Sequence, residues 1–163
     1  DHDARALGND LVPIKNFHIP GVILNSPKQP FLDTRIVSQI DLAPTLLSLM
    51  GVINYSPMLG HDLNKTDISE RAMMQYADNF AYMNKSGVSI LQPQKQPLSF
   101  NYDLKEQRLM PVEHNKALSE VALAHALWGS LAYENQWYAM PNELIDADPT
   151  NKVTRLLKRI TLT

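Results

Sequence analysis

Apolar residues in the second half of the chain fall into short runs separated by polar stretches. The runs are rich in β-forming side chains and lie at residues 72–76, 80–83, 88–91 and 98–102. Such close spacing predicts antiparallel hairpins, with a tight turn at residues 84–87. Residues 107–110 fit one more edge strand before Pro111. The pattern therefore predicts a small antiparallel sheet.

The longest helical pattern follows this sheet, over residues 116–137. Apolar residues recur there at spacings of three and four, at Ala117, Val121, Ala124, Trp128 and Leu131, with Leu123 and Leu127 beside them. We expect this stripe to pack on the sheet rather than to bind a cofactor. His125 lies in the same helix. We expect it to be a hydrogen-bonded structural histidine, because no second metal-binding side chain follows four residues later.

The first half of the chain predicts one strand and one shorter helix. Residues 22–24 are a continuous apolar run between turn-forming residues, which indicates a strand buried on both faces, as in a parallel sheet covered by helices. A helix is expected to end at Gly51, the residue after its last turn, and to begin at Asp41 as its N-cap. Ser38 is the alternative N-cap, but it would place Pro44 toward the helix interior. Its apolar stripe would consist of Leu42, Leu46, Leu49 and Met50. His61, in the loop that follows, is expected to be solvated.

Composition narrows the classes of protein that remain. The 163 residues are 44% hydrophobic and 20% charged, as in a globular domain rather than a disordered chain. The formal net charge of −2 provides no basic surface for nucleic acid. The sequence contains no cysteine, which excludes disulfides and thiolate metal sites. It also contains no run of about 18 apolar residues, so no transmembrane segment is expected.

Candidate chemistry is concentrated at the start of the sequence, where Asp1 and His2 are adjacent. A carboxylate oxygen and an imidazole nitrogen together suit Zn²⁺ or Mn²⁺, although two ligands do not complete a site. An Asp-His dipeptide is common, so the order of the parts that follow it matters more than the pair itself. The pair is followed by a polar loop, by His18-Ile19-Pro20, by the predicted strand and by the helix at residues 38–51.

That order resembles the C-terminal part of the sulfatase and alkaline-phosphatase superfamily. The family pattern S-x-I-D-L-x-P-T-L-L-x-L-x-G is present at residues 38–51. Residues 16–20 and 57–63 are similar to the branch that contains lipoteichoic acid synthase and the phosphoglycerol transferases. The resemblance covers residues 1–63 and extends more weakly to Ala139. Asp3 stands where the family usually has glycine.

The resemblance implies a metal site and an anion-binding site. Asp1 and His2 would bind a divalent metal ion, with Mn²⁺ first and Zn²⁺, Mg²⁺ or Ca²⁺ as alternatives. Lys15, His18 and Arg5 would contact sulfate or phosphate oxygens of the substrate. His18 could instead bond to the backbone at the strand entrance, and Arg5 could lie on a surface loop. The nucleophile of the family lies upstream of this region, so no catalytic nucleophile is expected in this chain.

The fold class that the resemblance implies is α/β. Residues 1–66 would be the C-terminal part of an alkaline-phosphatase-like catalytic core, with a parallel-type strand and a packing helix. Residues 67–140 would be a small antiparallel sheet packed on a long helix. Residues 141–163 would form a tail, with a short helix as one option.

Two functions from different classes are compatible with these features. The first is a fragment of a metal-dependent phosphoglycerol transferase or sulfatase-like hydrolase. It would act through a covalent intermediate on phosphate or sulfate esters, with a phosphatidylglycerol-type lipid as one substrate. The resemblance to the phosphoglycerol transferase branch implies a catalytic domain anchored in the bacterial inner membrane and facing the periplasm or the outside. The rest of the same polypeptide would then supply the anchor and the nucleophile. The second is a non-catalytic packing or interaction domain that retains a remnant of the fold.

Overall fold

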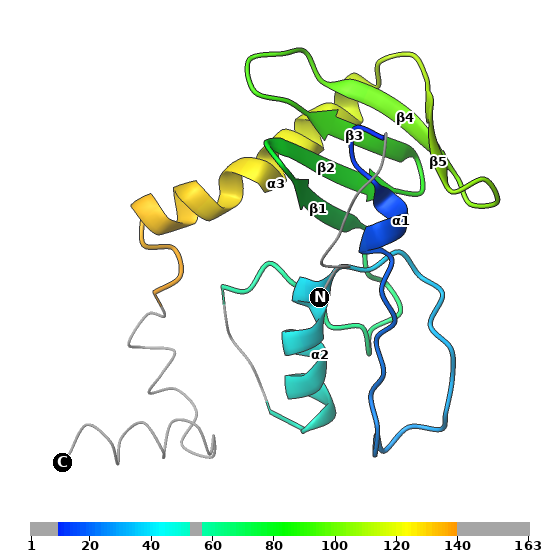
Figure 1. Cartoon of the computed structure of the whole chain (residues 1–163). Helices are drawn as coiled ribbons and strands as arrows, with labels where there is room; N and C mark the ends of the chain where they lie inside the picture. Colours follow the sequence, from blue (N-terminus) through cyan, green and yellow to red (C-terminus); the bar gives the residue numbers. More distant parts are fainter. Residues whose placement is uncertain (1–9, 53–56, 140–163) are drawn as a thin grey trace. The chain divides into compact units, whose positions relative to one another are not determined.

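The computed structural model describes residues 10–52 and 57–139 (Figure 1). Asp1, His2, Arg5 and the predicted tail at 141–163 lie outside the described residues. The chain groups into two compact units, one of Asp1–Gln39 with Ser69–Gly129 and one of Ile40–Ile68 with Ser130–Thr163. The division into residues 1–66, 67–140 and 141–163 remains a prediction.

The first unit contains the predicted antiparallel sheet. Its strands are β1 (Ala72–Tyr76), β2 (Asn79–Asn84), β3 (Gly87–Leu91), β4 (Leu98–Asp103) and β5 (Arg108–Pro111). They pair in sequence order, each antiparallel to the next. The β2–β3 turn requires its glycine, because Gly87 has φ +132° and an added Cβ would lie 2.8 Å from the carbonyl oxygen of Phe100. The hairpins predicted from the apolar runs are therefore confirmed.

The long helix α3 (Lys116–Glu134) covers one face of this sheet. The prediction that its apolar stripe packs on the sheet is wrong. The side chains that it buries are Leu118, Ser119 and Ala122, whereas Val121 and Leu127, from the predicted stripe, are exposed. The helix is therefore rotated about its axis relative to the prediction, and polar contacts between the helix and the sheet explain this rotation.

Two serines of the sheet meet the first turns of α3. The hydroxyl oxygens of Ser89 and Ser119 lie 3.0 Å apart in a buried hydrogen bond. Ser99 accepts a hydrogen bond from the N–H of Asn115, whose side-chain oxygen accepts one from the N–H of Leu118. Because these bonds sit in the interface, turning the apolar stripe inward would leave buried hydroxyl groups without partners.

His125 is the structural histidine that the sequence predicts. Its Nδ1 lies 2.9 Å from the carbonyl oxygen of Val121, and its ring centroid lies 4.7 Å from that of Tyr82 on β2. Burial raises the pKa of the Tyr82 hydroxyl, and the nearby charge of Arg71 opposes that rise. His125 therefore belongs to the packing between sheet and helix.

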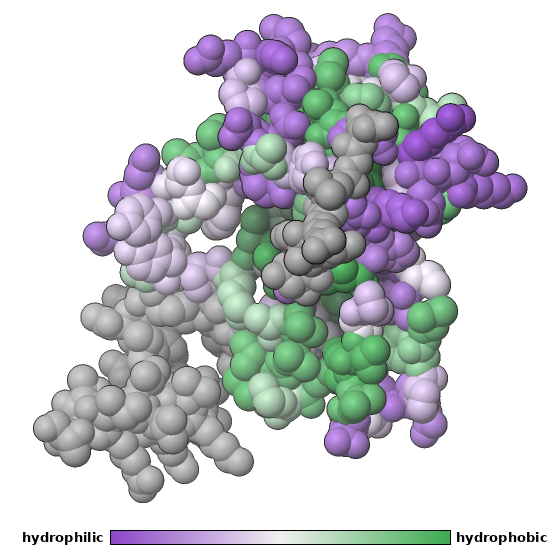
Figure 2. Space-filling model, in the orientation of Figure 1, coloured by the Kyte–Doolittle hydropathy of each residue, from purple (hydrophilic) through white to green (hydrophobic). Residues whose placement is uncertain are grey.

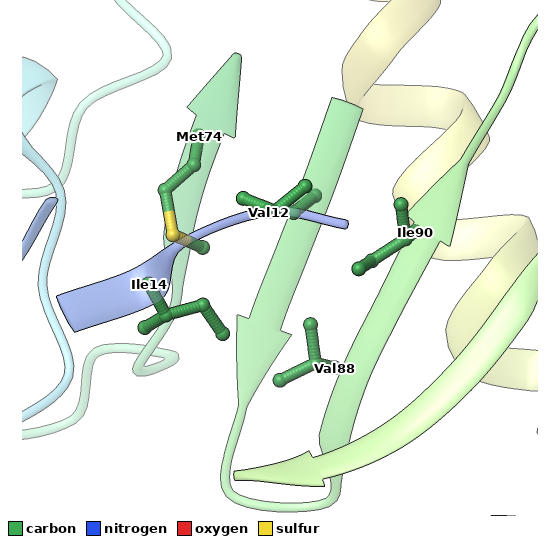
Figure 3. Packing of buried hydrophobic residues seen from close by; sticks show 6 residues of the cluster. Val12, Ile14, Met74, Val88 and Ile90 are labelled. Carbon is green, nitrogen blue, oxygen red and sulfur yellow. The ribbon is translucent and has the colours of Figure 1, made fainter. Parts of the chain in front are cut away.

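The other face of the sheet is covered by a segment from near the start of the chain (Figure 1). This segment contains α1 (Ile14–Phe17), a single helical turn. Val12 and Ile14 are buried against a patch of sheet residues that contains Met74, Ala81, Val88 and Ile90 (Figure 3). The sheet is thus covered on both faces, by α1 and α3, which lie far apart in the sequence.

The strand expected at residues 22–24 is not formed. Val22 and Leu24 are 76% and 79% exposed, and neither joins a strand of the sheet. The backbone N–H and C=O groups of a strand need hydrogen-bond partners on a neighbouring strand. No described strand pairs with residues 22–24. The prediction of a strand there is therefore wrong for the described structure.

The second unit contains the helix that carries the family pattern, α2 (Leu42–Leu49), which the 3₁₀ turn η1 (Gln39–Asp41) precedes. The helix and its end at Gly51, which has φ +70°, are as predicted. Its predicted buried stripe is wrong, because Leu42, Leu46 and Met50 are exposed. Figure 2 shows this apolar surface over α2.

The buried residues at α2 are polar instead: Thr45 within the helix and Asp41 at its N-cap. Asp41 occupies the N-cap position but makes no side-chain cap; its Oδ1 accepts the N–H of His61 at 2.7 Å. Thr45 donates to the carbonyl oxygen of Asp41 at 2.6 Å and accepts the N–H of Leu63 at 2.9 Å. An added Cβ at Gly60 would collide with the carbonyl of Ile40. The residues of the family pattern therefore hold the loop at 57–64 against α2.

His61 is part of this contact and is not the solvated residue that was predicted. It is half-buried, and its Nδ1 is shielded from solvent with no hydrogen-bond partner among the described residues. The N–H of His61 bonds to Asp41, as above, and its carbonyl oxygen lies 3.5 Å from the Thr45 hydroxyl. The backbone of His61, rather than its ring, therefore makes the contacts that hold the loop against α2.

Candidate functional site

Two of the predicted substrate-binding residues lie on one turn of the first unit. Lys15 is inside α1, and His18 is the residue that ends it, with its N–H bonded to the carbonyl oxygen of Lys15 at 3.3 Å. Residues three apart on a helical turn are neighbours on its surface. The structure thus places Lys15 and His18 on the same turn, which we call the 15–18 turn.

Local backbone bonds define the shape of this turn. The N–H of Ile14 bonds to the carbonyl oxygen of Val12 at 2.9 Å, and the N–H of Asn16 bonds to that of Pro13 at 2.9 Å. Pro13 has φ −79°, which suits the position before a helical turn, and its missing N–H is not needed there. The sequence therefore folds into a tight turn directly before His18.

Within the turn, burial separates structural residues from candidate functional ones. Ile14 is buried and Phe17 half-buried, whereas Lys15 and His18 are exposed. Neither the Lys15 ammonium nor the His18 ring makes a hydrogen bond or ion pair with another described residue. No acidic residue lies in the first turn of α1. Two nitrogen-bearing side chains are therefore available to an external anion, and the backbone-bonded alternative for His18 is not observed.

The other predicted site residues cannot be placed beside this turn. Asp1, His2 and Arg5 lie outside the described residues, so their roles remain predictions. Within residues 10–52 and 57–139, no group of three or more His, Cys, Asp or Glu side chains is arranged to hold a metal ion. The described residues therefore do not by themselves fit a metal site. In the same ranges, no helix has the length and apolarity needed to cross a membrane.

Acidic groups with shifted pKa values belong to structural contacts. The pKa of Glu70 is lowered by its hydrogen bond with Lys85, 2.5 Å away, and by the N–H of Ile36 at 3.1 Å. The pKa of Asp33 is lowered by its hydrogen bond with Arg35. For Asp62, burial opposes ionisation, yet hydrogen bonds from Asn64 and Ser48 hold its pKa below the usual value. None of these carboxylates contacts Lys15 or His18.

Sequence reasoning missed the residues that hold the turn in place. The rings of Phe17 and Tyr76 meet edge to face, and the side chain of Asn79 donates to the carbonyl oxygen of Leu11. Tyr76 and Asn79 lie about 60 residues after the turn in sequence, within segments that read only as strand and hairpin signals. No local pattern connects them with the turn.

No family model matches the sequence. Among solved structures, the chain is similar to the crystal structure of a protein in the alkaline phosphatase superfamily from Vibrio parahaemolyticus. The two share 44% sequence identity with a TM-score of 0.79, over 86% of this chain. This likeness supports the alkaline phosphatase superfamily.

The superfamily agrees with the α/β fold class inferred from the sequence, with its five-stranded antiparallel sheet and long helix. The match spans 35% of the Vibrio protein's chain. It supports a hydrolase or transferase family in general terms and does not distinguish between the superfamily's branches.

Proposed function

We propose that the chain is part of an alkaline phosphatase superfamily enzyme that hydrolyses or transfers phosphate or sulfate esters. The observation that carries the proposal is the 15–18 turn, which presents Lys15 and His18 with no partner among the described residues. A lysine ammonium and a histidine N–H are suitable donors to phosphate or sulfate oxygens. The identity shared with the Vibrio protein supports the superfamily on which the proposal rests.

The finer proposal is a phosphoglycerol transferase acting on a phosphatidylglycerol-type lipid at the outer side of a bacterial inner membrane. Its support is the similarity of residues 16–20 and 57–63 to that branch. We assign the nucleophile and the remaining metal ligands to residues outside these 163. The covalent intermediate would form on that nucleophile.

Within this proposal the site residues have separate roles. Asp1 and His2 bind a divalent ion, with Mn²⁺ preferred over Zn²⁺, Mg²⁺ and Ca²⁺. Such an ion would stabilise negative charge on the ester oxygens. Lys15 and His18, together with Arg5, bind and orient the non-reacting oxygens of the substrate. Orientation of this kind raises rate because fewer unproductive poses of the substrate remain.

A packing or interaction domain without catalysis is the second candidate. The exposed apolar side chains of α2, Leu42, Leu46 and Met50, favour it, because an exposed apolar patch often marks an interaction surface. The two candidates predict opposite results for the site residues. Only the enzyme loses function when Asp1, His2, Lys15 or His18 is replaced.

The test is ester turnover by the full-length protein, with 4-nitrophenyl phosphate, 4-nitrophenyl sulfate and phosphatidylglycerol vesicles as substrates. Lys15→Ala and His18→Ala should each raise KM about tenfold, because a charge-assisted hydrogen bond is lost. His2→Ala should lower the bound metal content. Lys28→Ala and His114→Ala, which replace exposed residues elsewhere, are matched controls and should leave KM unchanged. Equal KM in the site variants and controls contradicts the proposed role of the turn.

A further inference from the structure

We propose that the cross-strand pair Tyr76 and Asn79 positions the 15–18 turn for oxyanion binding. This inference rests on the proposed function of Lys15 and His18. Tyr76 ends β1, Asn79 begins β2, and the two are directly opposite each other beside the hairpin turn. Opposite residues of an antiparallel pair project on the same face of a sheet. Here that face is the one that α1 covers.

Tyr76 contacts the end of the turn. The ring centroids of Tyr76 and Phe17 lie 6.4 Å apart with an interplanar angle of 87°, an edge-to-face contact. Phe17 is the last residue of α1 and directly precedes His18. The position of this ring therefore limits where the backbone can place His18.

Asn79 holds the start of the same segment. Its side-chain Nδ2 donates to the carbonyl oxygen of Leu11 at 3.1 Å. The next residue, Val12, is fully buried against the sheet, and Ile14 follows it into the same cluster. Figure 3 shows both side chains directed toward Val88 and Ile90. The pair thus holds the segment on both sides of α1.

These contacts matter for the site because they help to position the backbone that carries Lys15 and His18. Neither side chain bonds to a described residue, so the backbone of the turn sets the points from which the ammonium and the imidazole reach into solvent. After His18 the chain continues through exposed residues at 20–25, which belong to no helix or strand. The contacts at Phe17 and Leu11 therefore add to the backbone bonds of the turn and to the burial of Val12 and Ile14 in fixing this backbone. Tyr76 and Asn79 are positioning residues, because they act through the turn.

The experiment uses the full-length protein with inorganic phosphate as the probe. Tyr76→Leu removes the ring contact, Tyr76→Phe retains it, and Asn79→Ala removes the hydrogen bond to Leu11. The matched control is Tyr82→Leu, which removes a buried ring from the opposite face of the same sheet, against α3. Phosphate affinity is measured by competitive inhibition. Hydrogen exchange is measured at the N–H groups of Asn16 and His18, both bonded within the turn.

We expect Tyr76→Leu and Asn79→Ala to raise the phosphate inhibition constant and the KM for ester roughly tenfold, with a smaller change in kcat. Exchange at Asn16 and His18 should accelerate by about the same factor. Tyr76→Phe should restore both readouts. Tyr82→Leu should lower stability without changing either one. Unchanged exchange in both Tyr76→Leu and Asn79→Ala overturns the inference, as does equal weakening of phosphate binding by Tyr82→Leu.

Different measurements test the binding role of Lys15 and His18 and the positioning role of Tyr76 and Asn79. If Lys15→Ala and His18→Ala leave phosphate affinity unchanged, the proposed role of the turn in binding is wrong. The exchange measurement does not depend on activity, so it still decides whether Tyr76 and Asn79 hold the turn. Asn79→Ala changes no ring packing, which keeps the test decisive if Tyr76→Leu does not fold.

Discussion

The sheet of the first unit and the helix α2 of the second bury different kinds of side chain. Val88 and Ile90 in the sheet have no exposed surface, and their partners come from the α1 segment. At α2 the buried residues are polar, since its N-cap Asp41 is 1% and Thr45 3% exposed, whereas its C-cap Met50 is 67% exposed. The sheet is therefore stabilised mainly by apolar burial, and the α2 loop by hydrogen bonds. The difference shows that one chain can be stabilised by apolar burial in one segment and by buried hydrogen bonds in another.

The largest expected effect tests the apolar side of this comparison. Ile90→Ala should lower the free energy of unfolding by about 3 kcal/mol, because it leaves a cavity in a fully buried cluster. Leu42→Ala, which truncates an exposed residue of α2, should cost no more than about 0.5 kcal/mol. Urea unfolding of both variants is the measurement. A cost for Leu42→Ala close to that for Ile90→Ala would show that the apolar side of α2 is covered in solution.

A smaller effect tests the polar side. Thr45→Val keeps the size of the side chain but removes its hydrogen bonds with the carbonyl of Asp41 and the N–H of Leu63. Unfolding should become easier by about 2 kcal/mol, because buried backbone groups lose a partner. The exposed Thr34→Val is the matched control and should be nearly neutral. If thermal unfolding gives the same midpoint for both variants, hydrogen bonds do not hold the α2 loop.

The smallest effect concerns the ion pair beside the sheet. Because the hydrogen bonds from Lys85 and Ile36 lower the pKa of Glu70, the folded state favours its charged form. That stabilisation is present above the ordinary glutamate pKa of about 4.3 and is lost as pH falls through the lower folded value. Glu70→Gln should flatten the acid side of the stability profile slightly. Glu106→Gln, at an exposed turn, is the control, and identical acid profiles for the two variants would contradict this contribution.

The sequence named Lys15 and His18 as candidate site residues, but it gave no sign of the residues that support them. Lys15 and His18 follow from the resemblance and from their place before an apolar run. Their joint exposure on one turn required the structure, because it depends on Ile14 and Phe17 facing the sheet. Tyr76 and Asn79 gave no signal in the sequence, because the contacts that they make are with residues about 60 positions away. Asp1, His2 and Arg5 remain predictions from the sequence.

The sequence by itself determined the elements whose signals are local. The hairpins follow from short apolar runs and turn residues such as Gly87, and α2 follows from its continuous family pattern. Periodicity also located α3, but it did not determine which face of the helix meets the sheet. The bond between Ser89 and Ser119 decides that face, and the bond between Asp41 and His61 decides how α2 is buried. Such choices belong to the tertiary structure, because a buried polar group needs its partner and that partner lies 20 to 30 residues away.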